Sequence, residues 1–163
     1  MKILFVRHAI AVDPMEFNGD DLGRPLTEEG VFKARRLFKM LARFYEAPEL
    51  IVSSNAVRAR QTAGLLAEIF PKADRAHTPE FNPGADHRVL VHWLRGLDHT
   101  WERVAVVGHE PDISRMIAGA VAHGGLNIEV KKAACIEVDC NRLGRGELTL
   151  LLPPWAAKKS DES

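Results

Sequence analysis

The sequence predicts an α/β protein in which a mostly parallel β-sheet lies between two layers of helices. Three short apolar runs, at residues 2–7, 50–52 and 103–107, have the length and composition of buried strands. Each run is followed by a stretch whose apolar residues recur at helical spacing. Strands that alternate with helices in this way form a three-layer α/β/α sandwich, because the connecting helices pack back on the sheet.

The predicted elements follow one another in a regular order along the chain. Thr27 can cap the first helix, whose first turn carries two acidic residues that suit the helix dipole. Asp86 can cap the third helix, and Pro111 suits the first turn of the fourth, where its missing N–H would have no partner. The predicted helices cover about residues 27–44, 56–70, 86–97 and 111–123, a short extended piece lies between Pro71 and Pro79, and two alternating runs at 133–139 and 147–152 are predicted as strands.

Length and composition fit one globular domain. The chain has 163 residues, of which 46% are hydrophobic and 27% charged, and its 22 basic residues are balanced by 22 acidic ones. This balance predicts binding to neither nucleic acid nor an anionic membrane. No apolar stretch reaches the length of a membrane span, and no signal peptide is visible. We therefore expect a cytoplasmic protein with a single domain at 1–152 and a frayed polar tail at 153–163; the sequence leaves its oligomeric state open.

The two cysteines predict no disulfide bond. Cys135 and Cys140 lie five residues apart in one predicted strand, so their side chains point to opposite faces of the sheet. We expect them to be small apolar side chains of a protein from a reducing compartment. The other histidines show no spacing typical of a metal site, and no nucleotide-binding loop is present, so we expect neither a metal nor a cofactor.

Two histidines follow predicted strands. His8 comes directly after Arg7 at the end of the first strand, and His109 follows Gly108 at the end of the third. Parallel strands end at the same edge of a sheet, where open α/β sheets bind their ligands, so we expect the two histidines to share a pocket. Gly108 would allow a ligand to approach closely or the backbone to adopt an unusual angle. Taken singly, each histidine is more often structural or merely exposed than catalytic.

Two arginines suit this edge of the sheet to a phosphate group. A guanidinium is always charged and forms two parallel hydrogen bonds to phosphate oxygens. Arg7 precedes His8, and Arg58 lies in the first turn of the second helix, where backbone N–H groups already favour anions. Alone, Arg58 would be interpreted as a solvent-facing residue, as Arg60 is. Together, the histidines and arginines predict a phosphate-handling pocket.

Four motifs, in order along the chain, resemble those of the histidine phosphatase superfamily, which contains the cofactor-dependent phosphoglycerate mutases. Val6-Arg7-His8-Ala9 is similar to the Arg-His-Gly signature of the superfamily. The compact length and the motifs at residues 24–30, 54–62 and 109–111 most resemble the SixA-type phosphohistidine phosphatases. The likeness extends over roughly residues 1–152. Four ordered motifs are far more specific than a three-residue motif alone.

The resemblance implies a phosphoglycerate mutase-like fold and a phosphatase that needs no cofactor. The implied substrate is phosphohistidine on a protein, such as a histidine phosphotransfer domain. His8 would be the nucleophile that takes the phosphoryl group on a ring nitrogen, Arg7 and Arg58 would clamp the phosphoryl oxygens, and His109 would complete the pocket. Elementary chemistry agrees, because phosphoryl transfer requires mainly in-line positioning and charge stabilisation.

Two positions raise questions about the family pattern. Ala9 replaces the usual glycine, and its methyl group would crowd the backbone if this position needs a positive φ. Many members of the superfamily use a carboxylic acid as general acid, and Glu80 is the positional candidate. A SixA-type enzyme depends less on such an acid because an imidazole leaves more readily than an alkoxide. A helix-start or surface carboxylate is therefore an equal interpretation of Glu80.

Two other functions are alternatives. A phosphatase of small phosphometabolites, or a mutase, could use the same pocket, although mutases usually carry longer insertions around a sugar phosphate. This chain is short, so we expect an open and shallow pocket. A noncatalytic phosphate-binding module would keep the arginines and lose the nucleophile, whereas both histidines are present here.

Overall fold

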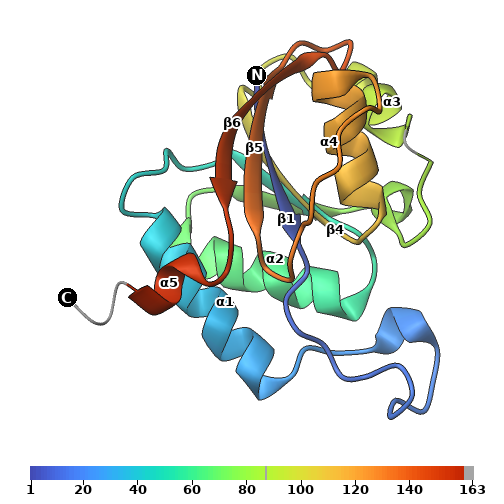
Figure 1. Ribbon diagram of the computed structural model, residues 1–163, viewed down its shortest axis with the longest axis vertical. Helices are drawn as coiled ribbons and strands as arrows, with labels where there is room; N and C mark the ends of the chain where they lie inside the picture. Colours follow the sequence, from blue (N-terminus) through green and yellow to red (C-terminus); the bar gives the residue numbers. More distant parts are fainter. Residues whose placement is uncertain (87, 160–163) are drawn as a thin grey trace.

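The six-stranded sheet of the computed structural model, which describes residues 1–86 and 88–159, confirms the predicted α/β architecture (Figure 1). The strand order is β3-β2-β4-β1-β5-β6. The first four strands of this order run parallel, whereas β5 is antiparallel to β1 and β6 is antiparallel to β5. The strands are β1 (Lys2–Arg7), β2 (Leu50–Ser53), β3 (Asp74–His77), β4 (Arg103–Gly108), β5 (Cys135–Cys140) and β6 (Gly146–Leu152).

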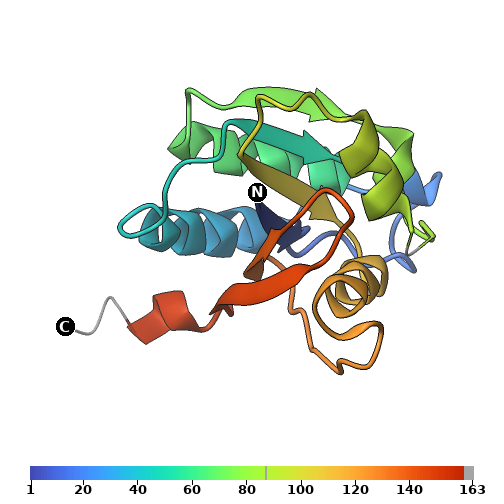
Figure 2. The same ribbon diagram turned by 90° about the horizontal axis from the view of Figure 1, so that it is seen from above.

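Helices cover both faces of the sheet, as the two perpendicular views show (Figures 1 and 2). One face carries α1 (Glu28–Leu41), α2 (Val57–Ile69) and α5 (Ala156–Lys159), and the other carries α3 (Val89–Gly96) and α4 (Asp112–Ala122). Two short 3₁₀ helices, η1 (Asp21–Gly23) and η2 (Pro79–Phe81), lie in the connections. Within the described residues, none of the helices combines the length and apolarity needed to cross a membrane.

Alternation along the strands divides the core into two halves. In β1, Leu4 and Val6 pack toward α1 and α2, whereas Ile3 and Phe5 pack toward α3 and α4. All four are fully buried, and burying a side chain of this size stabilises a fold by roughly 1.5–3 kcal/mol. The two free cysteines of β5 are buried in opposite halves of the core, which confirms the prediction that their side chains point to opposite faces of the sheet.

The start of α1 matches the prediction and shows why its first turn contains a glycine. Thr27 Oγ1 accepts a hydrogen bond from the Gly30 N–H at 3.0 Å, which caps the helix. The same turn packs on the segment that follows His8, because the Thr27 N–H donates to the Ile10 carbonyl at 3.0 Å. A Cβ atom on Gly30 would lie 2.1 Å from that carbonyl oxygen, so only glycine fits this contact.

Two boundary predictions are wrong. Asp86 does not cap α3: its carboxylate accepts from the Arg88 N–H at 2.8 Å and pairs with the Arg88 guanidinium, so the helix begins later, at Val89. The segment after residue 152 is not a frayed tail over its described part. It forms α5, in which Ala157 is buried and accepts a hydrogen bond from Arg36 at 3.1 Å. Residues 160–163 lie outside the described residues.

Candidate active site

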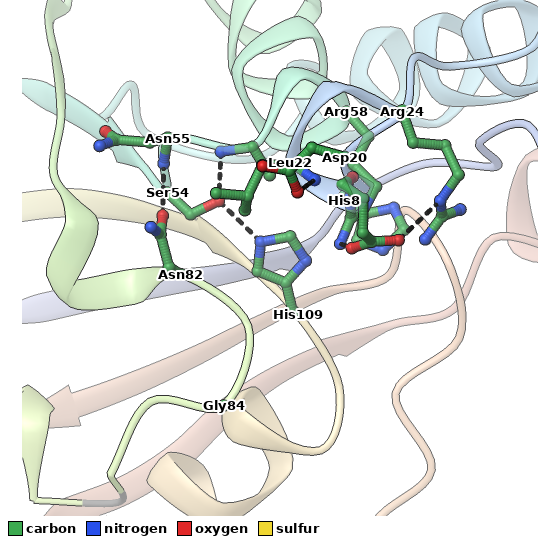
Figure 3. Close-up of polar contacts among 12 residues, drawn as sticks. His8, Asp20, Leu22, Arg24, Ser54, Asn55, Arg58, Asn82, Gly84 and His109 are labelled. Atoms are coloured by element: carbon green, nitrogen blue, oxygen red, sulfur yellow. Dashed lines mark hydrogen bonds and ion pairs between the residues drawn. The ribbon is translucent and has the colours of Figure 1, made fainter. Parts of the chain in front are cut away.

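The register of the sheet brings the two predicted histidines together. Arg7 of β1 pairs with Gly108 of β4, so His8 and His109, which follow them, leave the sheet side by side. Their ring centroids are 5.2 Å apart (Figure 3). Ser54, which follows the neighbouring strand β2, joins them at this edge. The register therefore places the two histidine rings beside each other, and the prediction that they share a ligand pocket stays a prediction.

One ring nitrogen of His8 is fixed as a donor. The His8 side chain is buried, and its Nδ1 lies 2.7 Å from the carbonyl oxygen of Ala9. A carbonyl oxygen can only accept, so Nδ1 carries the proton and Nε2 keeps its lone pair. The Ala9 N–H in turn donates to Thr62 Oγ1 at 3.0 Å, which ties this segment to α2. The arrangement leaves Nε2 as a nucleophilic atom.

The hydrogen bonds of Ser54 are compatible with one proton arrangement on the second histidine. Ser54 Oγ lies 2.7 Å from His109 Nε2 and accepts the Ala56 N–H at 3.3 Å, so its hydroxyl proton can go to Nε2 (Figure 3). The neutral His109 ring then carries its own proton on Nδ1. This nitrogen is buried and has no hydrogen-bond partner within the described residues. It is a donor available to an anion.

The two arginines add further donors. The buried Arg58 guanidinium donates to the Asp21 carbonyl at 2.7 Å and to the Asp21 carboxylate at 2.9 Å, while its Nε has no partner within the described residues. Arg7 donates through one terminal nitrogen to the Val130 carbonyl at 2.8 Å, and its Nε is likewise unpartnered there. Buried donors without a partner are costly, so such a group of them is characteristic of an anion-binding site.

The surroundings keep both histidines neutral. Burial is the main cause that lowers the pKa of His8 from 6.5 to about 4; the Ala9 carbonyl opposes this shift, and the charges of Arg58, Arg7 and Lys132 add to it. Burial, followed by the neighbouring His8, lowers the pKa of His109 to about 3. Each ring therefore has an unprotonated nitrogen at neutral pH, as nucleophilic attack by an imidazole requires.

The lowered pKa of His8 predicts how the activity of the protein changes at acidic pH. Protonation occupies the Nε2 lone pair, so activity falls as the pH decreases through the pKa of His8, near 4 in place of 6.5. We expect the ring signals of His8 to show no titration between about pH 8 and about pH 5.5 in an NMR series recorded in phosphate-free buffer. A midpoint near that of a free imidazole would contradict the desolvated site.

Glu80, the proposed general acid, is not joined to this cluster. It lies on η2 with an exposed side chain, and its N–H donates to Thr78 Oγ1 at 3.3 Å. Within the described residues, no hydrogen bond or ion pair links its carboxylate to His8, Arg58 or His109. Its role as an acid stays a prediction.

Backbone angles answer the questions raised for Ala9 and Gly108. Among the described residues other than glycine, positive φ occurs at His123 and Ala133, so Ala9 is unstrained. Gly108 also lacks a positive φ, and a Cβ atom there would make ordinary contact with Ile113 at 3.6 Å. Of the two possibilities named for Gly108, the unusual backbone angle does not occur, and the close approach of a ligand stays a prediction.

Three supporting residues of the site carried no assigned role in the sequence. Ser54 and Thr62 fall within the 54–62 motif, and the spacing of four residues between Arg58 and Thr62 could have indicated the hydrogen bond between Thr62 Oγ1 and the Arg58 carbonyl. Asp21, which holds Arg58 and also pairs with Arg24 at 3.0 Å, lies in a polar loop without any distinguishing pattern. No cluster of three or more metal-ligating side chains occurs within the described part of the chain.

Comparisons with known proteins show the family of the chain. Residues 3–82 match the family model of the histidine phosphatase superfamily (branch 1). An uncharacterized protein from Picosynechococcus is 32% identical over 142 residues, which cover 83% of each chain.

Solved structures share the fold. The protein histidine phosphatase SixA in complex with tungstate superposes with a TM-score of 0.82 at 23% identity, covering 96% of this chain and 99% of that one. The α-ribazole phosphatase from Shigella flexneri superposes with a TM-score of 0.67 at 18% identity, covering 94% of this chain and 97% of that one. At these identities the superpositions establish the fold, while the family model and the relative that aligns over most of the chain establish the lineage. The chain belongs to the histidine phosphatase superfamily, and this membership supports a phosphatase activity.

Proposed function

We propose that the protein is a phosphatase that hydrolyses phosphohistidine on proteins through a covalent phosphohistidine at His8. The observation that carries the proposal is a neutral His8 with a free Nε2 lone pair, beside the His109 ring and close enough to Arg7 and Arg58 for their charges to lower its pKa. His109 and both arginines each have a buried donor without a partner among the described residues. A tetrahedral anion bound by these donors lies beside the nucleophile. Phosphoryl transfer needs little more than this placement and the matching positive charge.

The reaction proceeds in two displacements. His8 Nε2 attacks the phosphorus, the P–N bond of the substrate breaks, and the substrate imidazole leaves in neutral form when its other ring nitrogen carries a proton. Water then attacks the phosphorus of phospho-His8, the new P–N bond breaks, and inorganic phosphate leaves with the water oxygen. Splitting the hydrolysis in this way replaces one difficult step by two easier ones.

The arginines and His109 stabilise the phosphoryl group in both steps. The guanidiniums of Arg7 and Arg58 keep their charge at all relevant pH values, and His109 Nδ1 donates to a phosphoryl oxygen. Ser54 and Asp21 act as positioning residues, because one fixes the tautomer of His109 and the other fixes the orientation of Arg58. In this scheme the guanidiniums supply the charge that Mg²⁺ supplies in many other phosphoryl-transfer enzymes.

The leaving group favours a phosphohistidine substrate. An imidazole departs without strong acid assistance, which suits a site whose candidate general acid, Glu80, has an exposed side chain. The resemblance of the fold to SixA, described as a protein histidine phosphatase, supports the same substrate class. The α-ribazole phosphatase among the structural neighbours favours a second candidate, hydrolysis of a small phosphometabolite.

A panel of substrates separates these functions. We expect the purified protein to dephosphorylate a histidine phosphotransfer domain carrying phosphohistidine with a kcat/KM at least about tenfold above that for any phosphometabolite tested, since a protein offers additional contacts. Release of inorganic phosphate measures each rate. A strong preference for one metabolite would assign the second function, and phosphate binding without turnover of any substrate would assign a noncatalytic module.

A further inference from the structure

A groove lined by basic and aromatic side chains adjoins the candidate active site. Its volume is about 570 Å³, and it lies between the start of α1, the segment 129–133 and the chain around α5. Figure 1 shows α5 beside α1 at the end of β6. Arg7 belongs to the lining of the groove, and the Ala133 N–H donates to the Arg7 carbonyl at 3.0 Å. The groove is thus attached to the strand end that presents His8.

Positive charge is concentrated along this groove although the whole chain is neutral. Glu129 is the one acidic side chain of the described lining, and the basic ones are Arg7, Lys33, Arg36, Lys131, Lys132 and Lys158. Lys33 and Lys131 each pair with a glutamate, whereas Lys132 and Lys158 form no ion pair within the described residues. Lys132 is close enough to contribute to the lowered pKa of His8. An anion in the groove is therefore attracted toward the nucleophile.

Two exposed aromatic side chains belong to the same lining. Phe32 of α1 is 62% exposed and Trp155, just before α5, is 54% exposed. The Arg36 guanidinium lies over the Phe32 ring, 5.7 Å from its centroid. Aromatic residues and arginine are the side chains enriched at the centres of protein interfaces. The combination points to a polypeptide with both apolar and acidic residues.

We propose that this groove docks an acidic segment of the protein that carries the phosphohistidine. The inference rests on the proposed function and adds the position and the chemistry of the contact with the substrate protein. The cations come from four separate parts of the chain and are spread along the groove. This spread fits several carboxylates on an extended surface better than a metabolite, whose site needs a few polar groups converging on one point. Charges of this kind chiefly raise the association rate and its salt dependence.

Two phosphohistidine peptides test the groove. One carries aspartate and glutamate beside the phosphohistidine, and the other carries asparagine and glutamine at the same positions. We expect the acidic peptide to have a kcat/KM about tenfold higher at low salt, with the difference vanishing as NaCl screens the lysines. In the double variant K33Q/K158Q the preference falls to about twofold or less, while turnover of an aryl phosphate is unchanged. The matched control K39Q/K72Q removes two exposed lysines outside the groove and keeps the preference.

Binding separates this proposal from the proposed function. The unphosphorylated acidic peptide should shift the Trp155 indole signal in NMR spectra, whether or not the phosphopeptides are turned over. Failure of both phosphopeptides to react while this shift occurs would reject only the proposed function. An acidic-to-neutral ratio near one, or an unshifted Trp155 signal, would overturn the groove assignment. An equal loss of activity toward a phosphorylated metabolite in K33Q/K158Q would assign the groove to a small anion and overturn it as well.

Discussion

Replacing His8 by alanine is expected to lower kcat toward any phosphorylated substrate by about 10⁴-fold or more, because it removes the atom that accepts the phosphoryl group. In the proposed scheme Arg7, Arg58 and His109 keep their unpartnered donors, so the variant should bind the substrate without turning it over. Mass spectrometry after an acid-free quench should detect phosphate on His8 of the parent protein and none on the variant. Retained full turnover by His8→Ala would refute the covalent route.

A histidine outside the site provides the control for this experiment. His92 is exposed on α3, and its replacement by alanine is expected to change kcat by less than about twofold. Exogenous imidazole offers a second check, since the space left by the His8 ring can admit a free imidazole in its place. Partial recovery of His8→Ala by imidazole, with no effect on His92→Ala, would locate the lost function in the ring itself and not in the fold.

Much of the fold could be predicted because local signals agree with the tertiary structure. The apolar strands β1, β2 and β4 are buried on both faces, which leaves a continuous hydrophobic run in the sequence. The N-cap of α1 depends on a hydrogen bond between residues three apart in the sequence, so it could be predicted as well. Aspartate is an equally suitable N-cap residue, but the carboxylate of Asp86 accepts the Arg88 N–H and forms a turn before the helix. The helix α5 forms where the chain packs against α1, which is distant in sequence. The polar composition of this segment does not indicate that contact, so the helix could not be predicted.

In the candidate site, the residues at the strand ends could be predicted from the sequence, whereas the contacts made by the loops could not. The convergence of His8 and His109 follows from parallel strands that end at one edge, and the sequence shows both ends. The tautomers of the two rings depend on a neighbouring carbonyl and a serine hydroxyl, which only the coordinates locate. The contact between Asp21 and Arg58 joins residues 37 apart in sequence, and no pattern in the polar loop announces it.

Replacing Arg58 by lysine should have the second largest effect, about a 100-fold fall in kcat/KM, although the charge is kept. Arg58 uses its two terminal nitrogens to hold Asp21, and its buried Nε has no partner among the described residues, which in the proposed scheme is a phosphoryl oxygen. A lysine ammonium is a single point of charge that cannot hold the loop and reach the phosphoryl oxygens in the same fixed geometry. We therefore expect weaker binding of oxyanions as well as slower transfer, measured as the inhibition constant of tungstate beside the turnover of an aryl phosphate.

Arg60→Lys makes the same chemical change two residues further along α2, where the side chain is exposed, and it should leave both measurements within about twofold of the parent. The comparison separates a functional role from a structural one. If Arg58 only secured the loop at Asp21, its replacement would lower the thermal stability while the inhibition constant of tungstate stayed constant in the folded protein. A rise in that constant of about tenfold or more, with little change in melting temperature, would instead place the Arg58 guanidinium directly on the bound anion.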